Sequence, residues 1–299
     1  LINIEPDDKI KAYIRTDDLK NTEYINQMNV VMVTKNGTVK KTSLEAYSRP
    51  RTNGVNAIEI RDNDQLLGAR LTDGKSQIMI ATKNGKCIRF PEEKARAVGR
   101  GSIGVRGISL EKGDEAIGMI VVNELENDTV LVVSERGYGK RTAVLDYRET
   151  NRGGKGVITL NITEKTGHLI AIQSVTDDDG LMIINKSGVA IRMSMDAIRV
   201  MGRNTQGVKV INLKKNDEIA AIAKVEMDSD VAEVVEEDAE NAEPRVGEVD
   251  SNDVEFSTTE QTGNNAISNI GDEDVLKKIE EEEAENNKEK EDEDSGEAE

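Results

Sequence analysis

The sequence has 299 residues, one cysteine, no tryptophan and a formal net charge of −18 at pH 7. The single Cys87 rules out an internal disulfide or a cysteine-based metal cage, and it fits a reducing cytoplasm. No apolar run approaches the roughly 18 residues of a membrane span, so the sequence predicts neither membrane insertion nor secretion.

The negative charge is concentrated in one part of the chain. Residues 226–299 carry 29 acids and 5 bases, whereas residues 1–225 carry 35 bases and 29 acids. The acidic segment has few aliphatic side chains, so it cannot bury enough apolar surface to offset the entropy of ordering. We therefore expect a mildly basic folded body over 1–225 and a disordered acidic tail over 226–299. The tail is interpreted either as a solubilising appendage or as a DNA mimic that competes for the basic body.

The first residues, LINIEPDDK, alternate apolar and polar side chains as a strand does, with Ile2 and Ile4 on one face. Because the same pattern returns inside each later repeat, we expect the chain to begin within a repeat. One or two further units would then precede it, and their loss would leave a strand edge exposed.

Four β-hairpins are predicted in chain order. They read VVMVTKNGTVKKT from Val30, IMIATKNGKCIRF from Ile78, VLVVSERGYGKRT from Val130 and LMIINKSGVAIRM from Leu181. In each, two apolar runs rich in β-branched residues flank a polar residue and a glycine, which is typical of a tight turn with positive φ. The turn glycines, spaced 48, 52 and 51 residues apart, are Gly37, Gly85, Gly137 and Gly188.

A second glycine follows each hairpin glycine by 17 to 19 residues, at Gly54, Gly104, Gly156 and Gly207. Each is followed by an alternating apolar pair that predicts a half-buried strand. These pairs are Ile58/Ile60, Ile108/Leu110, Leu160/Ile162 and Ile211/Leu213. A further apolar segment completes each unit, so about four strands recur in about fifty residues.

This period predicts an all-β, propeller-like array of about four to five four-stranded blades. One small sheet cannot bury both of its faces alone and therefore needs neighbours. A β-solenoid or a series of separate β domains remains the alternative.

Basic residues recur at fixed offsets from these glycines. One base stands four residues after each hairpin glycine, another three or four residues before each second glycine, and a third eight residues before three of the second glycines. Equivalent positions in stacked blades lie on one rim, so we expect a belt that binds the phosphates of duplex DNA without reading its sequence. The candidate DNA-binding residues are Lys40, Lys41, Arg51, Arg89, Arg96, Arg100, Arg106, Lys140, Arg141, Arg148, Arg152, Gly153, Gly154, Lys155, Gly156, Arg192, Arg199, Arg203 and Lys209.

The segment RETNRGGKGV, residues 148–157, contains the glycine-rich part of this set. It matches neither a Walker A loop nor the GxGxxG pattern, and no helix follows it. We interpret it as one of the repeated loops between blades, with glycines that let the backbone approach a phosphate and with Arg152 and Lys155 supplying charge. With one histidine and one cysteine in different repeats, the sequence predicts no catalytic constellation and no metal site.

The hairpins, the segment LDYRETNRGGKG and the fifty-residue period together resemble the C-terminal domain of DNA gyrase A subunits, with topoisomerase IV as the nearest relative. The resemblance covers about residues 1–225. The family's gyrase box reads Gln-Arg-Arg-Gly-Gly-Lys-Gly, and Thr150 and Asn151 depart from its first two positions. The five positions that agree are Arg152, Gly153, Gly154, Lys155 and Gly156. Because the family's full box lies on its first blade, loop 150–156 is interpreted as a degenerate copy.

The resemblance implies a β-pinwheel, a propeller whose blades exchange strands and whose basic perimeter wraps duplex DNA with positive handedness. It also implies a type II topoisomerase that introduces negative supercoils, in an A2B2 complex whose gyrase B component hydrolyses ATP. ATP and Mg²⁺ belong to that holoenzyme, and no cofactor or catalytic tyrosine is assigned to this segment. The alternatives are a topoisomerase IV component that decatenates DNA and a non-enzymatic protein-interaction propeller.

Overall fold

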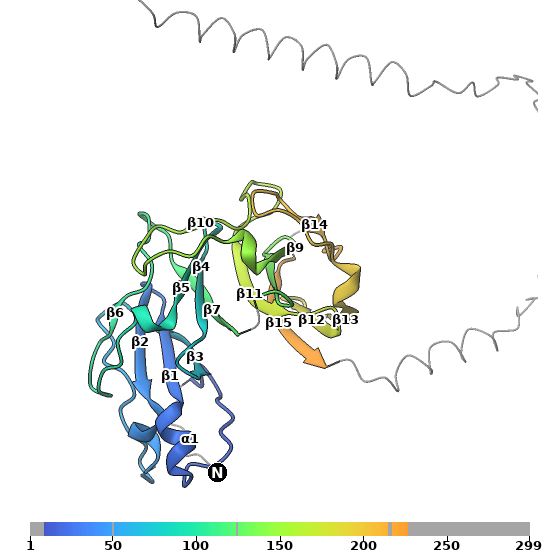
Figure 1. Ribbon diagram of the computed structural model, residues 1–299. Coiled ribbons are helices and arrows are strands. Elements are labelled where there is room, and N and C mark those ends of the chain that lie inside the picture. The colour runs from blue at the N-terminus through green and yellow to red at the C-terminus, as the bar shows by residue number, and fades with distance from the viewer. Residues whose placement is uncertain (1–8, 50, 124, 215–216, 227–299) are drawn as a thin grey trace, which may run out of the picture. The chain divides into compact units, whose positions relative to one another are not determined.

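The computed structural model describes residues 9–49, 51–123, 125–214 and 217–226, which all belong to one compact unit, Leu1–Ala242. These residues form short antiparallel strands joined by loops, with one α-helix, as the sequence predicts for an all-β array (Figure 1). The predicted acidic tail lies outside the described residues beyond Glu226. None of the helices in the described ranges is long and apolar enough to cross a bilayer.

The strands form four sheets, here named A to D in chain order. Sheet A contains β3 (Leu66–Thr72), β1 (Asn29–Thr34), β2 (Thr38–Ser43) and β6 (Val105–Arg106). Sheet B contains β7 (Ala116–Val122), β4 (Gln77–Thr82), β5 (Lys86–Pro91) and β10 (Val157–Ile158). Sheet C contains β11 (Leu169–Val175), β8 (Thr129–Ser134), β9 (Tyr138–Ala143) and β14 (Val208–Lys209). Sheet D contains, in the described part of the chain, β15 (Ile219–Glu226), β12 (Asp179–Asn185) and β13 (Ala190–Ser194).

Short helices mark fixed places in this repeat. The α-helix α1 (Thr22–Gln27) precedes sheet A, and the Asn21 side chain caps it by accepting a hydrogen bond from the amide of Tyr24. A 3-10 helix follows the second strand of each hairpin. These are η1 (Leu44–Tyr47), η2 (Glu92–Lys94), η3 (Val144–Asp146) and η4 (Met195–Ala197).

The four predicted hairpins are confirmed, and their glycines adopt φ between 78° and 86°. The blades also exchange strands, as the family resemblance implies. Strand β6 comes from the second repeat but pairs with β2 of the first, and β10 and β14 join the sheets of the second and third repeats in the same way. Each of these three junctions is therefore held by backbone hydrogen bonds as well as by side-chain packing.

The predicted strands at the second glycines are much shorter than expected. Each exchanged strand has only two residues, and the apolar pair that follows lies outside it. The first members of the pairs, Ile108, Leu160 and Ile211, are buried against the hairpin glycine of the preceding unit. The pair of the first repeat, Ile58 and Ile60, has no exchanged strand beside it in the described residues. The apolar alternation therefore marks a segment that covers the hairpin turn of the preceding unit, which we call its capping role, rather than a strand.

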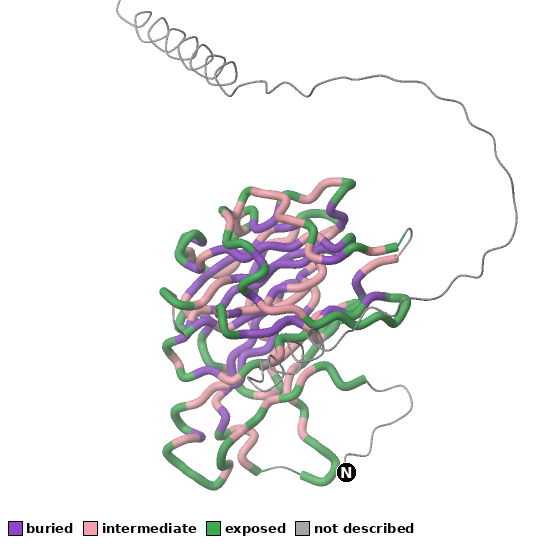
Figure 2. The backbone as a smooth tube through the Cα atoms, turned by 90° about the vertical axis from the view of Figure 1, so that its right-hand side faces the viewer, coloured by how far each residue is buried: buried purple, intermediate pink, exposed green. Residues whose placement is uncertain are grey.

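The hydrophobic core lies between successive sheets. Val31 and Val33 of sheet A pack with Ile78 and Ile80 of sheet B in one cluster. A second cluster joins sheets B and C, and a third joins sheets C and D. The buried backbone accordingly follows the strands while the exposed backbone follows the loops (Figure 2). Sheets B and C are thus covered on both faces by neighbouring sheets, whereas a fourth cluster, with Ile25 of α1 and Met32 of β1, covers the other face of sheet A.

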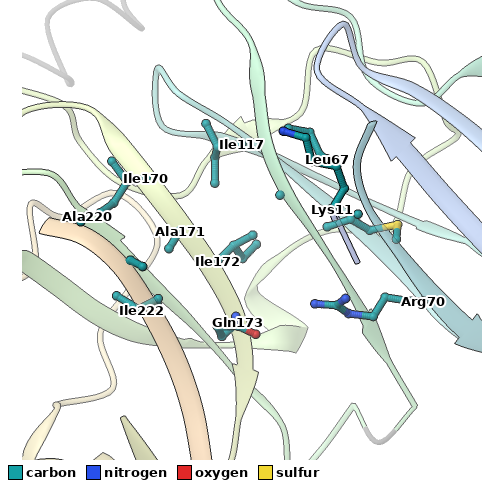
Figure 3. A pocket seen from close by; sticks show the side chains of 14 residues that line it. Lys11, Leu67, Arg70, Ile117, Ile170, Ala171, Ile172, Gln173, Ala220 and Ile222 are labelled. Carbon is teal, nitrogen blue, oxygen red and sulfur yellow. The ribbon is translucent and has the colours of Figure 1, made fainter. Parts of the chain in front are cut away.

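The strands β3, β7, β11 and β15 form the inner ends of the sheets and lie beside one another. They surround a cavity of about 280 Å³ that is lined mainly by aliphatic side chains, among them Ile117, Ile170 and Ile222 (Figure 3). Arg70 and Lys11 bring two positive charges to the same cavity. The exchanged strands therefore lie at the opposite, outer edge of sheets A, B and C.

Two hairpin glycines offer a matched test of this packing. Gly85 and Gly188 both have positive φ, but a Cβ at position 85 would collide with the carbonyl oxygen of Leu160, whereas position 188 is open. Gly188→Ala should cost about 1–2 kcal/mol of unfolding free energy from backbone strain alone. Gly85→Ala should cost about 3–5 kcal/mol because the next unit must move. Urea denaturation of the two variants checks this, and equal costs would contradict the capping role of Leu160.

Candidate nucleic-acid interface

Three loops of equal length connect the 3-10 helices to the exchanged strands. We call them the edge loops: 95–104, 147–156 and 198–207. Each leaves its own sheet after η2, η3 or η4 and ends at the outer edge of the preceding sheet, at β6, β10 or β14. The topology therefore brings equivalent residues of successive units to equivalent positions on the outer edge.

Most of the predicted basic residues in the edge loops reach solvent. The bases eight residues before the second glycine, Arg96, Arg148 and Arg199, are exposed. The bases four residues before it, Arg100, Arg152 and Arg203, are partly exposed. Arg51 of the first repeat and Arg192 on β13 are also exposed. These side chains form the candidate surface for a polyanion.

Two of the exchanged strands add a base to this surface. Arg106 on β6 and Lys209 on β14 are exposed and occupy the same place, two residues after the second glycine. The third exchanged strand has Ile158 there, and its side chain is also exposed. The basic surface is therefore interrupted at β10, where the neighbouring Lys155 is the exposed cation.

The glycine-rich edge loop packs against the preceding unit. The amide of Gly153 donates to the carbonyl oxygen of Gly107 over 2.6 Å, and Gly156 has a φ of 74° with no space for a Cβ beside the Cys87 carbonyl. The guanidinium of Arg152 donates to the main-chain oxygens of Lys94 and Arg106, over 2.8 and 3.2 Å. Gly153 and Gly156 therefore permit close packing of the protein on itself, and their contact with phosphate stays a prediction.

Five predicted DNA contacts are buried inside the blades, so their assignment to the surface was wrong. Lys40 and Lys140 are 1% and 0% exposed and donate to main-chain oxygens of the edge loops. Burial, and to a smaller extent the Arg203 charge, lowers the pKa of Lys140 to about 8. Burial, and then Arg100, lowers the pKa of Lys40.

The other three buried bases link one unit to the next. We call them the latch bases: Lys41, Arg89 and Arg141. Each stands four residues after a hairpin glycine. Each donates to the carbonyl oxygen of the first residue of the 3-10 helix in the following unit, which is η2 for Lys41, η3 for Arg89 and η4 for Arg141. These three bonds measure between 2.9 and 3.1 Å. The latch bases therefore stabilise the junctions and are not available to DNA.

The latch bases have further partners that differ between junctions. Lys41 lies 3.7 Å from the carboxylate of Glu92, which is fully buried. The Arg89 guanidinium also donates to the Tyr147 carbonyl over 3.0 Å. Arg141 donates to the Asp177 carboxylate over 2.5 Å. The shared contact is the one to the main chain, which explains why a base recurs here in units with different neighbours.

Sequence reasoning missed three bases, Arg61, Arg136 and Lys214, that line two grooves beside the exchanged strands β6 and β14. One groove, of about 590 Å³, is lined by Arg61, Arg106 and Arg152 together with Asp64. The other, of about 410 Å³, is lined by Arg136, Lys209 and Lys214 together with two acids. A signal was present, because Arg61 and Lys214 both directly follow an apolar pair. No group of three or more potential metal-ligating side chains occurs among the described residues.

The strand exchange, the four stacked sheets and the basic outer edge define a propeller-like repeat protein of the pinwheel type. The family described as "DNA gyrase C-terminal domain, beta-propeller" matches residues 29–73, 76–123, 128–176 and 181–226, which are the four units seen in the structure. The chain belongs to this family.

Individual relatives agree with this assignment. The DNA gyrase A subunit of Staphylococcus aureus strain MRSA252 is 43% identical over 229 residues, which is 77% of this chain and 25% of the relative. The solved C-terminal domain of DNA gyrase A is 25% identical with a TM-score of 0.65, over 75% of this chain and 72% of that one. The C-terminal domain of DNA topoisomerase IV is 25% identical with a TM-score of 0.64, over 71% of this chain and 67% of that one. The chain thus spans about a quarter of the curated relatives that it matches.

Proposed function

We propose that this chain binds duplex DNA along its outer edge and wraps it, as the C-terminal part of a DNA gyrase A subunit. The observation that carries the proposal is the recurrence of solvent-reaching bases at equivalent positions in the three edge loops. Regularly spaced cations match the regular phosphates of a duplex, about one charge per 1.7 Å of helix axis. The one α-helix among the described residues, α1, has six residues and no basic side chain, so the contacts position the backbone rather than read bases.

The wider activity that this proposal implies is that of a type II topoisomerase. The gyrase A subunit would work with gyrase B in an A2B2 complex, and ATP hydrolysis with Mg²⁺ by gyrase B would drive negative supercoiling of DNA in the cytoplasm. This chain would supply DNA wrapping and no catalytic group. The 43% identity to a curated gyrase A subunit favours gyrase, while the topoisomerase IV domain, which is 25% identical like the solved gyrase A domain, supports decatenation as the second candidate.

Equilibrium binding to a plain duplex of several hundred base pairs, measured across salt concentrations, tests the proposal. We expect binding at low salt that is similar for unrelated sequences, with log K falling linearly as log salt rises. A protein-interaction propeller would instead show no measurable duplex binding at low salt, and that result would overturn the proposal.

A further inference from the structure

Two buried lysines bind the main chain of two edge loops. Lys40 on β2 and Lys140 on β9 occupy the same place, three residues after a hairpin glycine. The ammonium of Lys40 donates to the carbonyl oxygens of Arg100 and Ala57. The ammonium of Lys140 donates to the carbonyl oxygen of Arg203 over 2.5 Å. Each lysine thus binds the backbone of a residue whose own side chain reaches solvent on the outer edge.

The contacts of Lys140 leave it no proton for an external partner. Its three donors face the carbonyl oxygens of Gly202 at 2.7 Å, of Arg203, and of Thr205 at 3.3 Å, together with the Thr205 hydroxyl at 3.0 Å. Four oxygens from the short segment 202–205 therefore converge on one buried cation. This fixes the backbone of the loop from inside, because the Arg203 carbonyl has no other donor among the described residues, whereas the Gly202 and Thr205 carbonyls also accept from the Thr205 hydroxyl and the Asn161 amide.

The Arg203 side chain is held in a defined direction by the same arrangement. Its guanidinium donates to the carbonyl oxygen of Ile158 over 3.1 Å and lies 6.0 Å from the centre of the Tyr147 ring. Both partners belong to the preceding unit. Any rotation of the loop backbone at Arg203 would break these contacts and redirect the guanidinium.

The middle edge loop provides an internal comparison. Ile88 replaces the lysine on β5, so no lysine side chain lies at the equivalent place behind loop 147–156. There the Ser109 hydroxyl of the preceding unit donates to the Gly153 carbonyl over 2.7 Å. The Ser109 amide also donates to the Gly154 carbonyl over 2.9 Å, a main-chain contact that has counterparts at the other two edge loops. Every edge loop is therefore fixed from the preceding unit, and in two of the three a buried lysine does so.

We propose that Lys40 and Lys140 are positioning residues for DNA binding, which hold Arg100 and Arg203 in register with the phosphate backbone. The proposal rests on the proposed function. It assigns the two lysines an effect on DNA affinity without any contact to DNA, because fixing the loops before binding removes an ordering cost from the binding step.

A double-mutant cycle tests this positioning role. Lys140→Met and Arg203→Ala should each weaken duplex binding by about tenfold, the value of one charge-assisted hydrogen bond. If Lys140 acts through Arg203, the double variant should bind within about twofold of Arg203→Ala alone. In the control cycle, Lys140→Met combined with Lys155→Ala should show the product of the two single effects, since Lys155 lies in another loop.

Two results would overturn the proposal. One is a double variant weaker than Arg203→Ala by the full factor of Lys140→Met, which would mean that Lys140 acts independently of Arg203. The other is unchanged hydrogen exchange at amides 202–206 in Lys140→Met without DNA, which would mean that the loop is fixed without the lysine. The exchange measurement needs no DNA, so it separates failure of positioning from failure of the proposed function.

The equivalent cycle at the first junction covers the case in which Lys140→Met does not fold. Lys40→Met and Arg100→Ala should show the same non-additivity in duplex binding, because the Arg100 carbonyl accepts from the Lys40 ammonium. Additive effects at this junction would count against the proposal as strongly as additive effects at the other. If neither methionine variant folds, the cycles use glutamine, which keeps one neutral donor at each site, so the single effects should be smaller and the same non-additivity is expected.

Discussion

Methionine in place of Arg89 is expected to lower the free energy of unfolding by about 2–4 kcal/mol. The guanidinium of this latch base donates to the main-chain oxygens of Val144 and Tyr147, both in the following unit. Methionine fills similar space but leaves the Tyr147 carbonyl without its donor, at about 1–3 kcal/mol, and removes a charge-assisted bond worth about 1 kcal/mol from the Val144 carbonyl, which keeps the Tyr147 amide at 3.1 Å. Chemical denaturation of the whole chain measures the change.

The matched control for Arg89 is Arg148, which lies in the adjacent edge loop and is exposed. Arg148→Met should change the unfolding free energy by less than about 0.5 kcal/mol. Similar small effects for the two variants would show that Arg89 does not stabilise the junction. The DNA affinity of the folded fraction of each variant gives a second check. If folded Arg89→Met bound DNA more weakly than folded Arg148→Met, Arg89 would belong to the DNA-binding surface after all.

Neutralising four exposed bases of the outer edge is expected to have the largest effect on DNA binding. The quadruple variant carries Arg96→Gln, Arg106→Gln, Lys155→Gln and Lys209→Gln. Each side chain is exposed, so glutamine should leave the fold intact. Because each neutralised phosphate contributes about 0.9 to the dependence of log K on log salt, the slope should become shallower by up to about 3.6.

Arg70→Gln is the control for that experiment. Arg70 is also exposed, but it lies on the inner strand β3 at the central cavity rather than on the outer edge (Figure 3). Its replacement should leave the salt slope unchanged within error. An unchanged slope in the quadruple variant would place the DNA contacts elsewhere on the chain, whereas a change in both variants would indicate a general effect of net charge.

The repeat and its hairpins could be predicted from the sequence because their signals are local. A polar residue and glycine between two β-branched runs define a turn wherever they occur, and Gly37, Gly85, Gly137 and Gly188 all adopt the positive φ that such turns require. The need of one sheet for a neighbour also follows from size alone. The family resemblance, which rested on the same segments, is confirmed by the matched family and by the fold.

The roles of individual bases could not be predicted because they depend on contacts between units. In an ordinary two-faced sheet, alternating strand residues separate a solvent face from a core face. In the first three hairpins both faces are covered, so Lys40 and the neighbouring Lys41 are both buried although they point to opposite faces of β2. A recurring base was correctly identified as significant, yet its partner was a carbonyl of the next unit rather than a phosphate. The prediction of exposure was correct for bases outside the long strands. Arg96 follows the 3-10 helix η2, Arg106 ends the short strand β6, and both are exposed.

The central claim is that bases of successive edge loops form one curved track that bends a duplex. Sealing a nicked circular DNA in the presence of the chain, and then removing the protein, measures this directly. We predict that the linking number of the sealed circles rises with protein concentration, as a positive wrap requires, and that the quadruple variant loses the shift. Circles sealed under saturating binding with the same linking numbers as circles sealed alone would contradict the claim, because the duplex would then be bound without being wrapped.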